Sequence, residues 1–121
     1  MASSSAHKRK LSGSTDGKAV KITTTATAGD TIHTAVAGTT VGTFDEIWLW
    51  AYNGHTSDVV LTVEFGGASV PDQNIVVTIP YKSGLIPIVP GFILQNGMVV
   101  KAFAGTANVV TIYGYVNTIM D

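Results

Sequence analysis

The sequence of 121 residues contains no cysteine, and this absence limits the chemistry that the chain can support. Without thiols there are no disulfides, no thiolate metal ligands and no cysteine nucleophile. Histidine is also scarce: only His7, His33 and His55 are present, and no two of them have the spacing of paired zinc ligands. We therefore expect neither a metal site nor a cofactor.

Charged residues are the second shortage. Asp, Glu, Lys and Arg make up 12% of the chain, about half the share of an average soluble domain. Apolar residues make up 45%. A folded surface with so little charge indicates that another protein covers part of it, because exposed apolar patches usually mark contacts. The alternative is that the many Thr and Ser side chains keep the surface hydrated.

The residues that usually carry catalysis are also missing. Asp45 and Glu46 are the only adjacent acidic pair, and neighbours in a strand point to opposite faces, so the two cannot act on one bond. There is no Gly-x-Ser-x-Gly elbow and no Asp-rich calcium loop. The sequence therefore predicts no catalytic residues, no small-molecule substrate and a protein that is not an enzyme.

Long apolar runs are absent as well. No run approaches the ~20 apolar residues of a membrane helix, and the first residues lack the apolar stretch of a secretory signal. We expect a soluble chain that makes no contact with a membrane.

What the sequence does contain is a series of short runs rich in Val, Ile, Thr and aromatic residues. Turn residues separate them at intervals of roughly 8 to 14 residues, which is typical of a sandwich or barrel. We expect an all-β fold: an antiparallel, jelly-roll-like β-sandwich of about eight strands that spans residues 18–121. The expected strands cover residues 19–25, 31–37, 45–52, 59–65, 74–79, 85–89, 98–103 and 109–116.

Turn chemistry suggests how some of these strands pair. The polar turns after residue 52 and after residue 104 predict two hairpins, one joining 45–52 to 59–65 and one joining 98–103 to 109–116. The run 85–89 contains Pro87, which lacks a ladder donor, so we place this strand at a sheet edge.

Residues 1–17 are mostly Ser, Gly, Lys and Arg and offer almost nothing to bury. We expect them to form a flexible basic N-terminal arm, disordered or extended, that a partner orders. Residues 1–21 have a net charge of +4, from five basic residues and one acidic residue, whereas the rest of the chain has a net charge of −5.

The arm cations are the predicted partner-binding residues, namely Lys8, Arg9, Lys10, Lys18 and Lys21. They suit an acidic protein surface or nucleic acid, since such charges contact phosphates; the alternative is a solvated tail. We expect protein and not nucleic acid, because the body is acidic and the arm has no aromatic residue to stack on bases.

The run 45–52 alternates Trp48, Trp50 and Tyr52 on one face with aliphatic residues on the other. The aromatic face is a core face, a subunit interface or a sugar-stacking platform. Only one face of a sheet lies inside a sandwich, so we expect one of the two faces to meet another copy of the chain, in a homotrimer.

The C-terminal third, residues 88–117, reads IVPGFILQNGMVVKAFAGTANVVTIYGYVN. Together with residues 48–67 it resembles small β-sandwich proteins of tailed-bacteriophage virions, in particular capsid decoration (cement) proteins. The resemblance implies a structural protein made in the host cytoplasm that binds the outside of the capsid, often as trimers. There it would stabilise the shell by bridging subunits of the major capsid protein, with an N-terminal extension lying along the capsid surface. No site residue follows from the resemblance.

A second hypothesis uses the aromatic residues differently. A carbohydrate- or receptor-binding β-sandwich, such as a head fibre or adhesin module, would use Trp48, Trp50 and Tyr52 as its sugar platform.

Overall fold

The structure is a computed structural model that describes residues 5–121. This part of the chain forms strands and no helix, so it contains no helix that could span a membrane. The strands are β1 (Ser5–Lys10), β2 (Val20–Lys21), β3 (Asp30–Thr34), β4 (Phe44–Asn53), β5 (Val59–Phe65), β6 (Asn74–Ile79), β7 (Ile86–Leu94), β8 (Val99–Ala104) and β9 (Val110–Met120). The predicted all-β fold is confirmed, with nine strands in place of about eight.

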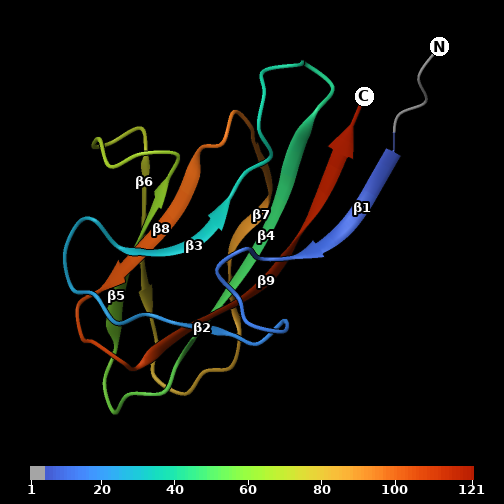
Figure 1. The fold of residues 1–121 in the computed structure, drawn as a ribbon. Helices are drawn as coiled ribbons and strands as arrows, with labels where there is room; N and C mark the ends of the chain where they lie inside the picture. The colour runs from blue at the N-terminus through green and yellow to red at the C-terminus, as the bar shows by residue number, and fades with distance from the viewer. Residues whose placement is uncertain (1–4) are drawn as a thin grey trace.

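The strands form two antiparallel sheets. Sheet A has the order β1-β9-β4-β7, and β2 also pairs with β9; sheet B has the order β3-β8-β5-β6. From β2 onward, every connection except the β5–β6 hairpin crosses from one sheet to the other. This alternation is the jelly-roll-like arrangement that the sequence predicted. Figure 1 shows β1, β9 and β4 side by side, with β3, β8 and β5 in the other layer.

Both predicted hairpins are wrong. β4 pairs with β7 and β9, and β5 pairs with β6 and β8, so the loop between β4 and β5 bridges the two sheets. The loop between β8 and β9 does the same. Two strands show the same alternation of apolar residues whether a hairpin turn or a loop between the sheets connects them. The sequence pattern therefore does not distinguish these two kinds of connection.

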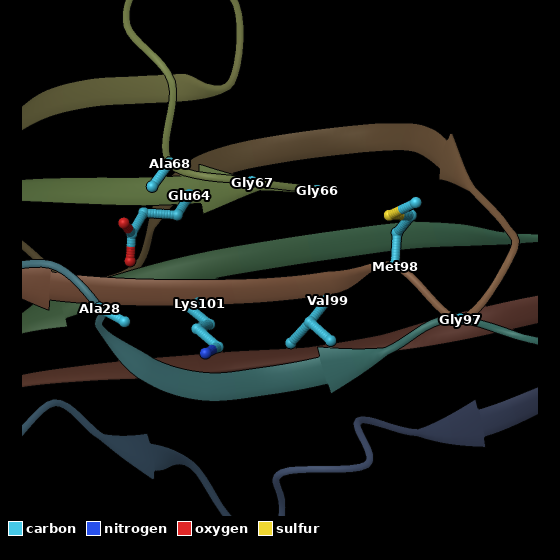
Figure 2. Close-up of a pocket in the computed structure, with 9 residues that line it drawn as sticks. All are labelled: Ala28, Glu64, Gly66, Gly67, Ala68, Gly97, Met98, Val99 and Lys101. Carbon is cyan, nitrogen blue, oxygen red and sulfur yellow. The ribbon is translucent and has the colours of Figure 1, made fainter.

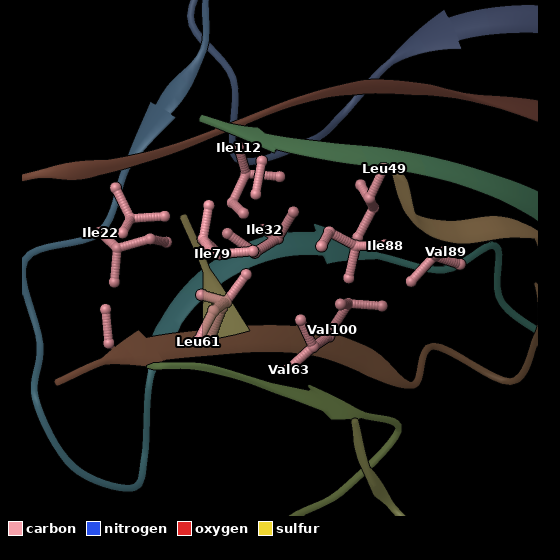
Figure 3. Packing of buried hydrophobic residues seen from close by; sticks show 14 of the residues in the cluster. Ile22, Ile32, Leu49, Leu61, Val63, Ile79, Ile88, Val89, Val100 and Ile112 are labelled. Atoms are coloured by element: carbon pink, nitrogen blue, oxygen red, sulfur yellow. The ribbon is translucent and has the colours of Figure 1, made fainter. Parts of the chain in front are cut away.

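The core lies between the inner faces of the two sheets. Leu49 and Ile112 of sheet A point toward Leu61, Val63 and Val100 of sheet B (Figure 3), and each of these side chains is at most 1% exposed. The strict alternation of β4 explains this placement, because Ile47, Leu49 and Ala51 are buried whereas the residues between them are partly exposed.

The N-terminal segment is extended and belongs to the sandwich. Residues 5–10 form β1, which pairs with β9 from Ser5 opposite Met120 to Lys10 opposite Tyr115. Leu11 is 1% exposed within the core cluster, and the buried Ser14 donates a hydrogen bond from Oγ to the Lys18 carbonyl (2.6 Å). Residues 5–17, which the sequence analysis assigned to the arm, thus contact the sandwich through β1, Leu11 and Ser14. Residues 1–4 of the predicted arm lie outside the described residues.

β7 is an edge strand, as predicted, but it is longer than expected. It continues through Pro87 and Pro90 to Leu94, and its register with β4 shifts twice. An edge strand tolerates proline because one side of its backbone has no ladder partner.

Candidate binding face

The aromatic residues of β4 lie on the outer face of sheet A. Trp48, Trp50 and Tyr52 are partly exposed, because the alternate residues of the strand fill the core. The structure thus places these three rings outside the sandwich core and leaves them available as a contact surface.

Tyr115 of β9 joins the two tryptophans. It is paired directly with Trp48, and directly paired residues share a face of the sheet. The ring centroids are 6.5 Å apart for Trp48 and Trp50, 6.5 Å for Trp48 and Tyr115, and 6.1 Å for Trp50 and Tyr115. The three ring planes lie within 26° of one another. We call Trp48, Trp50 and Tyr115 the aromatic platform.

A glycine lets the platform lie flat on the sheet. The Trp48 indole extends over Gly91 of the neighbouring strand β7, where a Cβ atom would come within 2.7 Å of the ring atom Cζ2. Gly91 also has a positive φ of 81°, which favours glycine over residues with a side chain. Since the Trp50 ring plane is within 18° of this indole, the two tryptophans present ring faces more than ring edges to solvent.

Two polar side chains border the platform. Glu46 Oε1 accepts hydrogen bonds from Trp48 Nε1 (2.9 Å) and from Asn117 Nδ2 (3.1 Å). The bond from Trp48, followed by the one from Asn117, lowers the pKa of Glu46 below its ordinary value of 4.5, against a small opposing effect of burial. The carboxylate is therefore ionised at neutral pH. Its second oxygen, Oε2, accepts no hydrogen bond from residues 5–121.

Three of the predicted arm cations lie on the same face. Lys8 Nζ is 4.4 Å from the centroid of the Tyr115 ring, a cation–π contact. Lys10 is paired with Tyr115 and Lys21 with Thr111, which places both on the outer face. The sheet thus places three of the arm cations on the same face as the aromatic residues of β4, which the sequence analysis treated as a separate candidate site.

The other two arm cations lie elsewhere. Arg9 is paired with the buried Val116, so its side chain leaves β1 on the side opposite to the platform. Lys18 is an exposed residue between β1 and β2. In the described part of the chain, the only contact within 4 Å between a basic side-chain nitrogen and a carboxylate oxygen joins His33 to Asp45, so none of the arm cations is paired with a carboxylate there.

The sequence analysis missed Glu46, Asn117 and Tyr115 as members of this face. A signal for the last two was present, because Tyr113, Tyr115 and Asn117 alternate with core residues in β9. Their position beside Trp48 depends on the pairing of β4 with β9, which no local pattern reveals.

Ser12, His33 and Asp45 form a group with the composition of a catalytic triad. His33 Nε2 donates to Asp45 Oδ2 (2.6 Å), but its Nδ1 accepts from the backbone N–H of Ser12 (3.0 Å). The Ser12 hydroxyl instead accepts from the backbone N–H of Thr34 (2.7 Å). A nucleophilic serine must donate its hydroxyl to the histidine, and here that nitrogen is occupied. The group therefore fastens the segment after β1 to β3 and β4.

A cavity of about 300 Å³ lies against sheet B, with Glu64, Met98 and Lys101 among its lining residues (Figure 2). Glu64 is 3% exposed, and its two carboxylate oxygens accept hydrogen bonds from the Gly29 N–H (2.7 Å) and the Thr27 hydroxyl. Both oxygens thus hold the loop before β3. This carboxylate supports the loop.

No group of three or more His, Asp or Glu side chains within residues 5–121 is placed to hold a metal ion. Comparisons of the chain with protein-family models, with curated proteins and with solved structures found no significant match. Within residues 5–121, the outer face of sheet A combines the aromatic platform, the Glu46 carboxylate and the Lys8 ammonium on one surface.

Proposed function

We propose that the protein is a non-enzymatic structural virion protein that binds the outside of a phage capsid and stabilises it by bridging major capsid protein subunits. The observation that carries the proposal is the exposed basic strand β1 at the edge of sheet A. All six of its residues are exposed, and Lys8, Arg9 and Lys10 have no carboxylate partner within residues 5–121. Such an edge suits an acidic protein surface. The resemblance of residues 88–117 to capsid decoration proteins supports the same partner.

Bridging requires a second contact, and the structure offers an apolar one. Val41 is 92% exposed and Ile93 56% exposed, and together with Phe44, Leu94 and Met98 they line a groove at one end of the sandwich. Exposed apolar surface of this kind favours association, so we propose that copies of the chain pack as a homotrimer through this groove, in place of the face of β4 that the sequence analysis expected. A trimer presents its basic edges to several capsid subunits at once, which raises avidity without stronger individual contacts.

Charge reversal at Arg9 tests the basic edge. Arg9→Glu should weaken binding to empty heads of the phage that encodes the chain by about tenfold, measured by cosedimentation at low ionic strength, because a rim charge acts through complementary potential. Binding of the unmodified protein should also weaken as salt is added.

Lys82→Glu is the matched control, because it makes the same charge change at an exposed position in the turn between β6 and β7. It should leave capsid binding nearly unchanged. Equal losses of capsid binding for Arg9→Glu and Lys82→Glu would mean that only the net charge of the protein matters. Capsid binding that does not weaken with added salt would contradict a role for the basic strand β1.

A further inference from the structure

We infer that the outer face of sheet A holds a binding site for a neutral polysaccharide, centred on the aromatic platform and Glu46. This inference goes beyond the proposed function, because it concerns a different ligand and a different side of β1 from Arg9.

The platform supplies the apolar half of such a site. One face of a pyranose ring consists largely of C–H groups, which stack on the face of an aromatic ring because the ring face is electron-rich. Trp48 and Trp50 present two nearly parallel rings whose centroids are 6.5 Å apart, and Tyr115, with Lys8 Nζ over its ring, lies beside both of them. An extended surface of this kind suits a chain of sugar rings better than a single compact ligand.

Glu46 supplies the polar half. Two hydrogen bonds to Oε1, from Trp48 Nε1 and Asn117 Nδ2, fix the carboxylate beside the platform, and Oε2 accepts no hydrogen bond from the described residues. An ionised carboxylate accepts hydrogen bonds strongly, and sugar hydroxyls are the donors that surround a stacked pyranose. The ammonium group of Lys8, over the Tyr115 ring, adds a donor for hydroxyl oxygens at the other side of the platform.

The charged side chains around the platform bear on whether it binds a neutral polysaccharide or single-stranded nucleic acid. An aromatic surface with Lys8 over one ring, and with Lys10 and Lys21 elsewhere on the same face, resembles the stacking surfaces that bind such strands. The sheet thereby gives the arm the aromatic neighbours that its own sequence lacks. The carboxylate of Glu46, however, is bonded directly to the platform and is ionised at neutral pH. It repels a phosphate and accepts a hydrogen bond from a hydroxyl, which favours an uncharged polyol at that side of the platform; Lys8 lies at the other side.

The test is a titration of tryptophan fluorescence with linear oligosaccharides of glucose, mannose and xylose, and with oligothymidylate as the anionic comparison. At least one neutral oligosaccharide should change the fluorescence of the full chain saturably, because Trp48 and Trp50 line the site. Calorimetry with the same oligosaccharide should show at least tenfold weaker binding for Trp50→Ala and for Glu46→Gln.

Phe92→Ala is the matched control. Phe92 is an exposed aromatic residue of the same sheet that packs edge-on against Phe65 and is paired with the buried Ile47, so it lies off the platform. This variant should bind the oligosaccharide like the unmodified protein. Circular dichroism shows whether each variant is folded, and Glu46→Gln, a nearly isosteric change at a partly exposed position, keeps the test valid if Trp50→Ala does not fold.

Three results would overturn the inference: no response to any neutral oligosaccharide, a response to oligothymidylate alone, or the same loss of affinity for Phe92→Ala as for Glu46→Gln. The outcome is independent of capsid binding, because cosedimentation of Glu46→Gln with heads should match that of the unmodified protein. Loss of head binding in Arg9→Glu with sugar binding intact would separate the two surfaces.

Discussion

Asp45 and Glu46 are neighbours in β4, yet their carboxylates have different environments because a strand sends successive side chains to opposite faces. Glu46 is at the outer platform, whereas Asp45 is 2% exposed. Asp45 accepts hydrogen bonds from His33 Nε2 (2.6 Å), the Val36 N–H (3.1 Å) and the Thr118 hydroxyl (2.7 Å). The sequence analysis correctly separated the two residues by face, but it had no means of identifying the partners of Asp45, which come from β3, β9 and the loop after β3.

Replacing Asp45 tests how much this buried network contributes to stability. Asp45→Ala should lower the free energy of unfolding by about 3 kcal/mol or more, because it leaves buried donors without an acceptor. Urea denaturation followed by circular dichroism measures the change. Glu46→Ala, next to it on the outer face, should cost less than about 1 kcal/mol; equal effects at the two positions would contradict the assignment of faces.

At the scale of elements, the sequence predicted the strands with strict alternation best. The ranges for β5 and β6 match the predicted residues 59–65 and 74–79, and β4 differs by one residue at each end. In each of these strands alternate apolar residues face the core, so local pattern defines the strand. β1 was not predicted, because its six residues are exposed and it exists only by pairing with β9. β2 is only two residues long, and it too forms a strand only by pairing with β9.

Leu11 anchors the segment that follows β1, which makes it a probe for this element. Leu11→Ala should lower the free energy of unfolding by about 2 to 5 kcal/mol, as expected for a leucine truncated in a packed core. Lys8→Ala, in the exposed strand itself, should cost less than about 1 kcal/mol. Chemical denaturation of both variants provides the comparison. If Leu11→Ala proved as mild as Lys8→Ala, the predicted flexible arm of residues 1–17 would be the better description.

For the whole molecule, the binding face depends on contacts between distant parts of the chain. Lys8, Trp48 and Tyr115 belong to three strands, yet they meet on one face of sheet A because β9 pairs with both β1 and β4. The sequence predicted the arm cations and the aromatic residues of β4 as two candidate sites. The arm cations and these aromatic residues lie on one face only because of the order of the strands in the sheet. Strand order in a sandwich depends on long-range pairing, which local sequence patterns do not determine.

The apolar groove is also formed by residues that lie far apart in the sequence. They come from the loop before β4, from β4 itself, from β7 and from the turn before β8. The low charge of the chain predicted that some surface is covered, and the structure shows where apolar side chains gather. Composition alone indicates the amount of such surface and not its place.

The most direct test of the proposed function is cryo-electron microscopy of phage heads, with and without the protein, from the phage to which the proposal assigns the chain. The proposal predicts added density on the outside of the shell, in clusters of three jelly-roll-like domains that meet through the groove of Val41 and Ile93. The β1 edge of each domain should face a neighbouring capsid subunit. Identical maps with and without the protein, or domains that contact the shell only through the β7 edge, would contradict it.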